Sequence, residues 1–167
     1  MARLALPPGD GEEGARMWSL RPDLGAAAHA FGDALQEGAR LPVRIREAAR
    51  IRIAHINGCI PCSETRVEDM ERHGLTEDFY AGVDDPDRRT DYAPREALAI
   101  AFAERFATGP AAFDDLFWAE LHAQFSAAEL LELATHCAKW LGLGRLNAVM
   151  EIATSCPIRI SAGPDIP

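Results

Sequence analysis

The sequence predicts an all-α fold, and three observations lead to this prediction. Apolar residues recur at helical spacing through most of the chain, as Leu98 and Phe102 do. Helix start signals separate the segments, among them Pro42 and the capping-box spacing of Ser126 and Glu129. No segment alternates apolar and polar residues as a half-buried strand does. We therefore expect a bundle of packed helices.

The first helices are expected after an arm. Residues 1–22 are rich in Gly, Pro and Glu and predict an arm that lies on the domain surface or on a neighbouring subunit. Asp23 is a plausible N-cap for a helix through Gly38, with Leu24 and Phe31 among its apolar residues. Pro42 opens a helix to Ile56 that is apolar on two sides. Two apolar sides predict a central helix or one shared with a neighbouring subunit.

The second half of the chain predicts more helices. Pro61 begins one whose charged stretch runs to His73, and Thr76 caps a short one over residues 77–82. A solvated loop is expected over residues 84–92. Further helices are expected over residues 94–108, 114–124 and from 126 to about 152, the last containing Gly142 and Gly144. The division is therefore an arm (1–22), one domain (23–155) and a tail without helical pattern (156–167).

Composition narrows the functional class. The chain of 167 residues suits a single domain with a sizeable core. Its net charge of −9 argues against nucleic acid or an anionic membrane as the main partner. No apolar run approaches the roughly 20 residues of a membrane span, and residues 1–10 lack the apolar region of a secretory signal. We therefore expect a cytoplasmic protein without a membrane partner.

The chain is organised around the sequence Cys59-Ile60-Pro61-Cys62. In a reducing compartment such a pair favours redox chemistry or metal binding over a structural disulfide framework. Cys62 is expected in the first turn of a helix, where the macrodipole favours a thiolate. Two other interpretations stay open: two small buried residues at a helix start, or a zinc site completed by other ligands, for which candidates are His55, His73, His136, Cys137 and Cys156. No second paired-ligand spacing exists, so neither a metal nor a cofactor is predicted.

Three residues near the cysteines could assist them. Glu47 lies on an apolar side of its helix, where a carboxylate is costly unless it is paired. It is either a salt-bridge partner of a nearby arginine or a general base that takes a proton from a cysteine. Arg66 is expected one helical turn after Cys62, where it would stabilise a thiolate or else pair with a surface carboxylate. His55, four residues before Cys59, could contact it or simply pack.

The spacing of these residues resembles the alkyl hydroperoxidase D/carboxymuconolactone decarboxylase family. Glu47 is followed after eleven residues by Cys59-x-x-Cys62, and Asn57-Gly58 and residues 72–76 also look like the family. The resemblance covers roughly residues 25–153. It implies an alkyl hydroperoxidase D-like helical bundle that assembles into trimers or hexamers. It also implies that Cys62 is the reactive thiol, Cys59 the resolving thiol, and Glu47 the carboxylate of a proton relay.

The chain departs from the family at two positions. Arg66 stands where the family has a relay histidine, and Pro61 stands between the cysteines where another histidine can occur. Pro61 also makes the pair similar to thioredoxin-type motifs, in which the first cysteine attacks. Which cysteine attacks and which one resolves therefore stays open. The resemblance predicts an oligomeric thiol oxidoreductase that reduces peroxides or disulfides, takes electrons from a thiol donor and needs no bound cofactor. The alternatives are a lyase of the decarboxylase type, whose chemistry needs no dithiol, and a non-catalytic or metal-binding helical module.

Overall fold

The computed structural model describes residues 2–154, and within this range it contains helices and irregular segments but no strand. The all-α prediction is thus confirmed for the described part of the chain. The helices are α1 (Glu13–Trp18), α2 (Pro22–Glu37), α3 (Val43–Asn57), α4 (Ile60–Glu64), α5 (Glu77–Gly82), α6 (Pro94–Thr108), α7 (Asp115–Gln124) and α8 (Ala127–Val149). Three short 3-10 helices join them: η1 (Met70–His73), η2 (Pro86–Asp91) and η3 (Pro110–Ala112).

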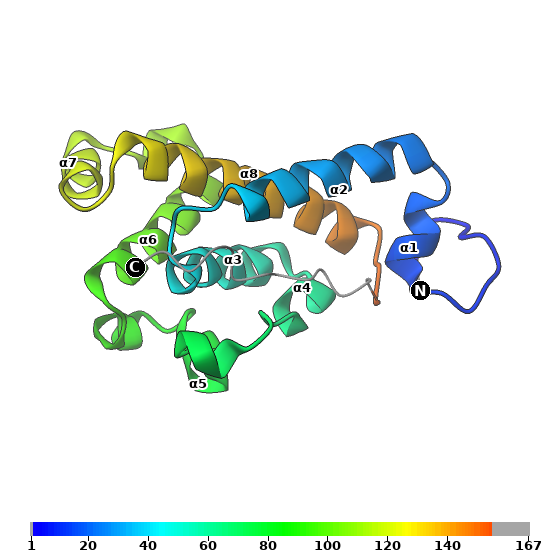
Figure 1. Ribbon diagram of the computed structural model, residues 1–167, viewed down its shortest axis with the longest axis horizontal. Helices are drawn as coiled ribbons and strands as arrows, with labels where there is room; N and C mark the ends of the chain where they lie inside the picture. The colour runs from blue at the N-terminus through cyan, green and yellow to red at the C-terminus, as the bar shows by residue number, and fades with distance from the viewer. Residues whose placement is uncertain (1, 155–167) are drawn as a thin grey trace.

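Helix α3 forms the centre of the molecule, with α2 and α8 on one side and α5 on the other (Figure 1). Its Ile45 and Ile53 belong to a core shared with α6, α7 and α8. Its Ile51 and Ala54 belong to a second core that includes residues of α5 and α6. Both apolar sides of α3 are therefore covered within one chain. Of the two sequence-based alternatives, the central helix is correct.

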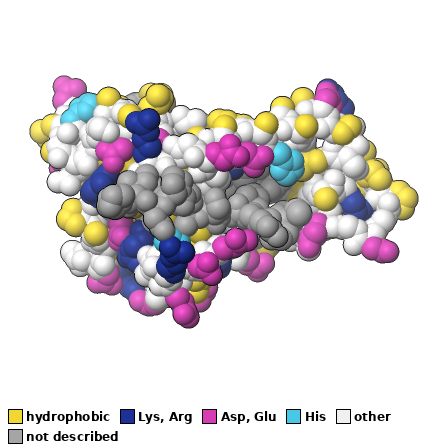
Figure 2. All heavy atoms as spheres, in the orientation of Figure 1, with side chains coloured by type: hydrophobic (Ala, Val, Ile, Leu, Met, Phe, Trp, Pro, Cys, Tyr) yellow, Lys and Arg dark blue, Asp and Glu magenta, His cyan; other side chains and the backbone are white. Residues whose placement is uncertain are grey.

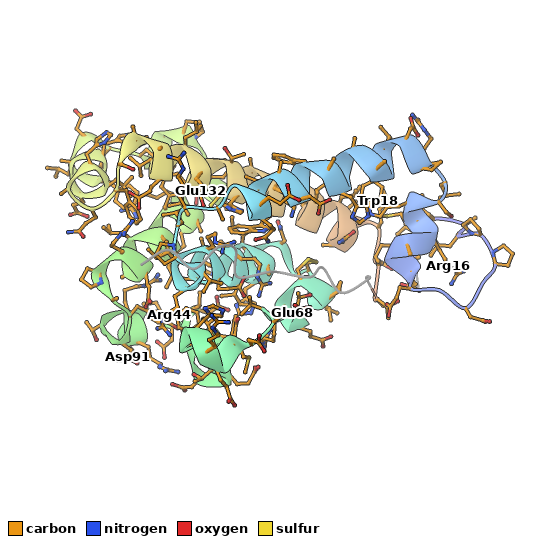
Figure 3. All side chains as sticks on the ribbon, viewed as in Figure 1. Arg16, Trp18, Arg44, Glu68, Asp91 and Glu132 are labelled. Carbon is orange, nitrogen blue, oxygen red and sulfur yellow. A yellow bond between two sulfur atoms is a disulfide. The ribbon has the colours of Figure 1, made fainter. Side chains whose placement is uncertain are left out.

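Two charged side chains tie α3 into this arrangement, and both are labelled in Figure 3. Arg44 of α3 donates to the carboxylate of Glu96 on α6 and to the backbone carbonyl of Gly74. The carboxylate of Glu132 on α8 accepts hydrogen bonds from the backbone N–H groups of Arg40 and Leu41, just before α3. These contacts fix the start of α3 between α6 and α8.

The chain turns sharply at the end of α3, where the cysteines follow. Gly58 has φ of 63°, a left-handed conformation that glycine adopts without steric cost. The backbone N–H groups of Gly58 and Cys59 donate to the carbonyls of His55 and Ala54. This turn ends α3 at the place predicted and puts Cys59 directly beside its last turn.

The expected helix from Pro61 to His73 is wrong beyond its first turn and a half. Helix α4 ends at Glu64, and Thr65 adopts an extended conformation while its hydroxyl donates to the Pro61 carbonyl. The chain then runs inward to bury Val67 in the second core. Asp69 has φ of 53°, which a continuing helix does not allow. Burial of an apolar side chain thus overrides the helical propensity of the charged residues.

The remaining predicted elements agree closely with the structure, including the Thr76 cap, α6, α7 and the capping box that begins α8. Helix α2 begins at Pro22, and Asp23 lies in its first turn, where it binds the Arg21 guanidinium rather than capping the helix. The expected loop over residues 84–92 contains η2. The predicted tail, including Cys156, lies outside the described residues.

The N-terminal arm lies on its own domain. The Gly14 N–H donates to the Thr154 carbonyl, and the Arg3 N–H donates to the carbonyl of Met150 just after α8. Figure 1 shows α1 beyond the C-terminal end of α8. These bonds join the arm to the surface of its own domain, which is one of the two places expected for it. None of the helices within residues 2–154 has the combined length and hydropathy that crossing a bilayer requires.

Candidate active site

The two cysteines at the end of α3 form a disulfide. Cys59 and Cys62 are bonded through their sulfur atoms, with their Cα atoms 5.2 Å apart. Cys59 is 1% exposed, whereas Cys62 in α4 is only half-buried. The two thiols of the reduced form therefore differ in access, and Cys62 is the one that a molecule from solvent reaches more readily.

Arg50 of α3 holds the backbone around Cys62. Its guanidinium donates to the carbonyl of Cys62 at 2.6 Å and to the carbonyl of Thr65 at 2.8 Å. Carbonyls at the C-terminal end of a helix have no N–H donor within the helix, and Arg50 supplies donors to these two. A buried cation is thus fixed next to the cysteine, and a positive charge at this place favours a thiolate.

Glu47 lies behind Arg50 and is paired with it. Two bonds of 2.7 and 2.8 Å join the Arg50 guanidinium to the two carboxylate oxygens, and the Tyr80 hydroxyl donates to one of them at 2.9 Å. Glu47 is 1% exposed. Burial and the neighbouring Glu47 charge raise the pKa of Tyr80, so its hydroxyl stays a donor at neutral pH. The salt bridge expected as one alternative for Glu47 is therefore present.

Helix α8 comes unusually close to the cysteine loop, and Asn57 holds the two together. Its side-chain amide donates to the carbonyls of Trp140 and Leu141, and its oxygen accepts from Arg145. A Cβ atom on Gly144 would lie 2.8 Å from the Asn57 amide nitrogen and 3.7 Å from the Cys62 sulfur. Gly144 therefore permits the close approach that the sequence suggested for one of the two glycines of this helix.

A pocket of about 70 Å³ opens beside Cys62, between α2, α3, α4 and α8. Its walls include apolar groups of Ala54, Trp140 and Leu143. Two cations also line it, Lys139 and the Glu47-paired Arg50, and none of its lining residues carries a carboxylate. Because Glu47 neutralises Arg50, Lys139 is the cation of this lining that has no carboxylate partner in the part of the chain that the structure describes. A small molecule in this pocket would lie against the sulfur of Cys62 among mostly apolar groups, with the ammonium of Lys139 nearby.

The two auxiliary residues predicted from the sequence contact other groups. Because α4 ends before Arg66, this residue does not share a helix face with Cys62, and that expectation is wrong. The Arg66 guanidinium pairs with Glu77 and lies over the ring of Tyr80, 4.2 Å from its centroid. The Nδ1 atom of His55 lies 2.7 Å from a carboxylate oxygen of Asp84. Neither contact involves a cysteine.

The sequence did not predict the parts that three residues play in the site. Arg50 binds the backbone at Cys62, Tyr80 donates to Glu47, and Lys139 lines the pocket. A signal for Arg50 existed, because it lies three residues after Glu47 and the two share a helix face. A signal for Lys139 also existed, since it interrupts an apolar stretch of the last helix. Nothing in the sequence connects Tyr80 with Glu47, which lies 33 residues away.

The other candidate metal ligands do not gather. Within residues 2–154 there is no group of three His, Cys, Asp or Glu side chains that could hold a metal ion. Cys137 lies in the core and its thiol is free; burial raises its pKa well above the ordinary value. His136 is buried and stacks on Trp140, with ring centroids 4.8 Å apart. These residues do not contribute to the cysteine pair.

Solved structures share this fold. A protein of unknown function from Agrobacterium tumefaciens, suggested to be the antioxidant defence protein AhpD, has a TM-score of 0.74 and 17% identity, over 90% of this chain and 96% of that one. The debrominase Bmp8 has a TM-score of 0.70 and 22% identity, over 87% of this chain and 78% of that one. A cysteine-to-alanine variant of Bmp8 in complex with 2,3,4-tribromopyrrole matches equally well. At these identities the likeness establishes an alkyl hydroperoxidase D-like fold and no shared activity.

Sequence comparison identifies the family. No curated protein sequence matches the chain significantly. The model of the carboxymuconolactone decarboxylase family matches residues 22–105, which is just over half of the chain and includes α2, α3 and the cysteine pair. This protein therefore belongs to the carboxymuconolactone decarboxylase family.

Proposed function

We propose that the protein is a thiol oxidoreductase in which the Cys59–Cys62 dithiol gives two electrons to a small peroxide or disulfide. The observation that carries the proposal is the bonded cysteine pair, one of whose sulfurs borders a pocket. A dithiol that closes into a disulfide is a two-electron donor by itself. The proposed reaction therefore needs no tightly bound cofactor, and an external thiol donor returns the protein to its reduced form.

In this proposal Cys62 attacks and Cys59 resolves. The Cys62 thiolate attacks the terminal oxygen of a hydroperoxide, the O–O bond breaks, and the alcohol leaves with a proton. Cys62 is then a sulfenic acid, which the Cys59 thiol attacks to form the disulfide and release water. With a disulfide substrate, Cys62 forms a mixed disulfide and expels one thiol, and Cys59 expels the second. The greater access of Cys62 supports this order.

Charge around the pair supports a reactive thiol. Arg50 sits at the Cys62 carbonyl and lines the same pocket, so its charge stabilises the thiolate. The five-residue helix α4 contributes little by its dipole. We propose that Glu47 takes the thiol proton and also holds Arg50 in place. The pH dependence of the Glu47→Gln variant separates these two roles.

We also propose that the protein works in the cytoplasm as a homo-oligomer, a trimer or a hexamer. Its family membership supports an assembly, and so does the exposure of Leu24 and Phe31 on α2. The physiological electron donor in this proposal is a small or protein thiol.

The test is a thiol-mapping experiment. The reduced protein is treated with one equivalent of tert-butyl hydroperoxide or glutathione disulfide, alkylated and mapped by mass spectrometry. We expect Cys59 and Cys62 to lose their thiols together and regain them with dithiothreitol, while Cys137 stays alkylatable after unfolding. Cys62→Ser should abolish substrate consumption, and Cys59→Ser should trap Cys62 as a sulfenic acid or mixed disulfide. Free thiols at both positions after treatment would remove the oxidoreductase proposal.

The same assay covers a second electrophile. Since the fold is shared with a debrominase, 2,3,4-tribromopyrrole belongs in the panel. Reductive debromination would replace a C–Br bond by C–H, release bromide and oxidise the dithiol to the same disulfide. A protein that consumes the bromopyrrole but neither peroxide nor disulfide would be a dehalogenase, and the substrate class proposed above would be wrong.

A further inference from the structure

A buried lysine lies in the same pocket as Cys62, and nothing in the mechanism above uses it. Lys139 of α8 is 9% exposed and lines the pocket. Within residues 2–154 its ammonium has no hydrogen-bond acceptor and no carboxylate at salt-bridge distance. The exposed carboxylate of Asp33 on α2 acts on it only through space. Lys139 is therefore a mostly buried cation without a carboxylate partner among the described residues.

The neighbouring helix leaves room for this ammonium. A Cβ atom on Gly32 of α2 would lie only 2.8 Å from Nζ of Lys139 and 3.3 Å from Cε. Gly32 itself is buried. The amine therefore packs closely against α2, and a side chain at position 32 would displace it.

The charges that line the pocket favour an anion. Placing an ammonium in a poorly solvated site is costly unless a counter-charge compensates it. Burial accordingly lowers the pKa of Lys139, and Asp33 offsets only part of this effect. The pocket lining contains a second cation, Arg50, but no carboxylate. A carboxylate entering the pocket would meet the one unpaired cation and remove this penalty.

We propose that Lys139 anchors a carboxylate of the molecule that the dithiol reduces. This inference rests on the proposed function and narrows its substrate class to small electrophiles, hydroperoxides or disulfides, that carry an anionic group. The pocket volume of about 70 Å³ is less than half of the roughly 150 Å³ cavity that accommodates benzene. The part of the substrate that enters is therefore a short chain, with its reacting atom at Cys62 and its carboxylate at Lys139.

Two probes of matched size test the anchor. 3,3′-Dithiodipropionate carries a carboxylate at each end, and 3,3′-dithiodipropionamide is its neutral analogue. In each reaction the Cys62 thiolate breaks the probe's S–S bond and releases one mercapto product, and Cys59 then releases the second as the protein disulfide forms. The rate constants are measured by acid quench and mass spectrometry of the reduced protein, and their ratio, diacid over diamide, is the quantity compared.

Lys139→Met should lower this ratio about 10- to 100-fold, the range expected for loss of one charge-assisted hydrogen bond. Any effect of the lost charge on the reactivity of Cys62 acts on both probes and cancels from the ratio. Methionine is apolar and similar in length, so the variant removes a buried charge without leaving a large cavity. Arg40→Met, which removes an exposed cation, controls for the change in net charge and should leave the ratio unchanged.

A measurement on the unaltered protein makes the test independent of the variant. Propionate should compete with the diamide for the pocket and slow its reaction, whereas propionamide should not. If the wild-type protein reacts with neither probe, the proposed reduction of disulfides fails. If both probes react but Lys139→Met leaves the ratio unchanged, or propionate and propionamide act alike, the dithiol function stands and the Lys139 anchor is wrong.

Discussion

Glu47 is a buried carboxylate that orders the groups around Cys62. Its two oxygens accept from the Arg50 guanidinium and from the Tyr80 hydroxyl, and Arg50 in turn holds the backbone of Cys62. A carboxylate with a full set of donors stabilises its own charge and orders its neighbours. The same group is the carboxylate that the family resemblance assigns to a proton relay.

The variant Glu47→Gln separates the structural role of Glu47 from its proposed role in proton transfer. Glutamine keeps the size and one acceptor of glutamate but cannot take a proton at neutral pH. We expect the rate of thiol oxidation at pH 7 to fall about 10- to 100-fold, the low end of general-base contributions. The difference in rate between wild type and variant should shrink as the pH rises past the thiol pKa, because the thiol then ionises without a general base. Stopped-flow oxidation at pH 6 to 9 measures the profile.

Circular dichroism and a denaturant titration serve as controls for Glu47→Gln, since the unpaired Arg50 charge will destabilise the fold. A deficit of equal size at every pH would show that Glu47 only positions Arg50. Tyr80→Phe provides the comparison, because it removes one donor to Glu47 and leaves the carboxylate in place.

Two glycines of α8 provide a matched pair of variants. Gly144→Ala puts a methyl group 2.8 Å from the Asn57 amide, which must then give up its bonds to Trp140 and Leu141. Gly142 has no neighbour within 4 Å of an added Cβ atom. We expect Gly144→Ala to cost about 1–2 kcal/mol of unfolding free energy and to slow the dithiol. Gly142→Ala should be neutral or stabilising by up to about 1 kcal/mol.

Urea unfolding of the two alanine variants, with the thiol-oxidation assay, gives the result. If both glycine variants had the same stability, the approach of α8 to the cysteine loop would be looser than the distances indicate. Because both changes introduce the same methyl group in the same helix, helix propensity cancels from the comparison.

At the scale of elements, the sequence predicted most helices because their starts and ends carry local signals. Thr76, Asp114 and Ser126 cap their helices with side-chain oxygens, and Gly58 ends α3. Helix α4 was overestimated because its end depends on the burial of Val67 in a distant core, which no local pattern reveals. The mistaken position of Arg66 followed directly from this error.

The site could be predicted only in part for the same reason. Glu47 and the cysteines lie within 16 residues of sequence and have a recognisable spacing. Tyr80 and Lys139 reach the site from α5 and α8, so their place depends on how the helices pack. Residues far apart in sequence are brought together by the fold, and a single sequence does not record which ones.

At the scale of the whole molecule, His136 makes stability depend on pH. It is 1% exposed; neither ring nitrogen has a partner at hydrogen-bond distance, and Nε2 lies 3.8 Å from a carboxylate oxygen of Glu132. Burial lowers the pKa of His136, with the charges of Arg46 and Lys139 acting in the same direction and Glu132 opposing them. The folded state therefore holds the ring neutral, while the unfolded chain binds a proton near pH 6.5. Its contribution is full above that pH and is lost as the pH falls through the folded pKa.

We therefore expect the unfolding free energy to decrease between pH 7 and pH 5, and His136→Phe to reduce this decrease by about 1 kcal/mol. Phenylalanine keeps the stacking on Trp140 and loses no hydrogen bond, so the variant should be at least as stable at pH 7. Urea titrations at four pH values test this, with the exposed His29→Gln as control. An unchanged pH dependence in His136→Phe would assign it to other groups.

Helix α2 exposes an apolar face, which bears on whether the protein assembles. The buried residues of α2 are Gly25 and Gly32, while Leu24 and Phe31 are 50% and 41% exposed. These two lie seven residues apart and so on one face of the helix. Figure 2 shows hydrophobic side chains along the edge of the molecule formed by α2. The apolar face of an amphipathic helix normally packs against another element. No element among the described residues covers this face of α2.

We therefore predict that a second copy covers the α2 face and that the protein is a trimer or larger at micromolar concentration. Multi-angle light scattering measures the mass. The double variant Leu24→Glu with Phe31→Glu should dissociate the assembly, because burying two carboxylates in an apolar interface is unfavourable. Leu116→Glu on α7 changes an even more exposed leucine, at 79%, and should leave the assembly intact. A monomeric wild-type protein would refute the assembly, and a double variant that stays assembled would place the interface on another face.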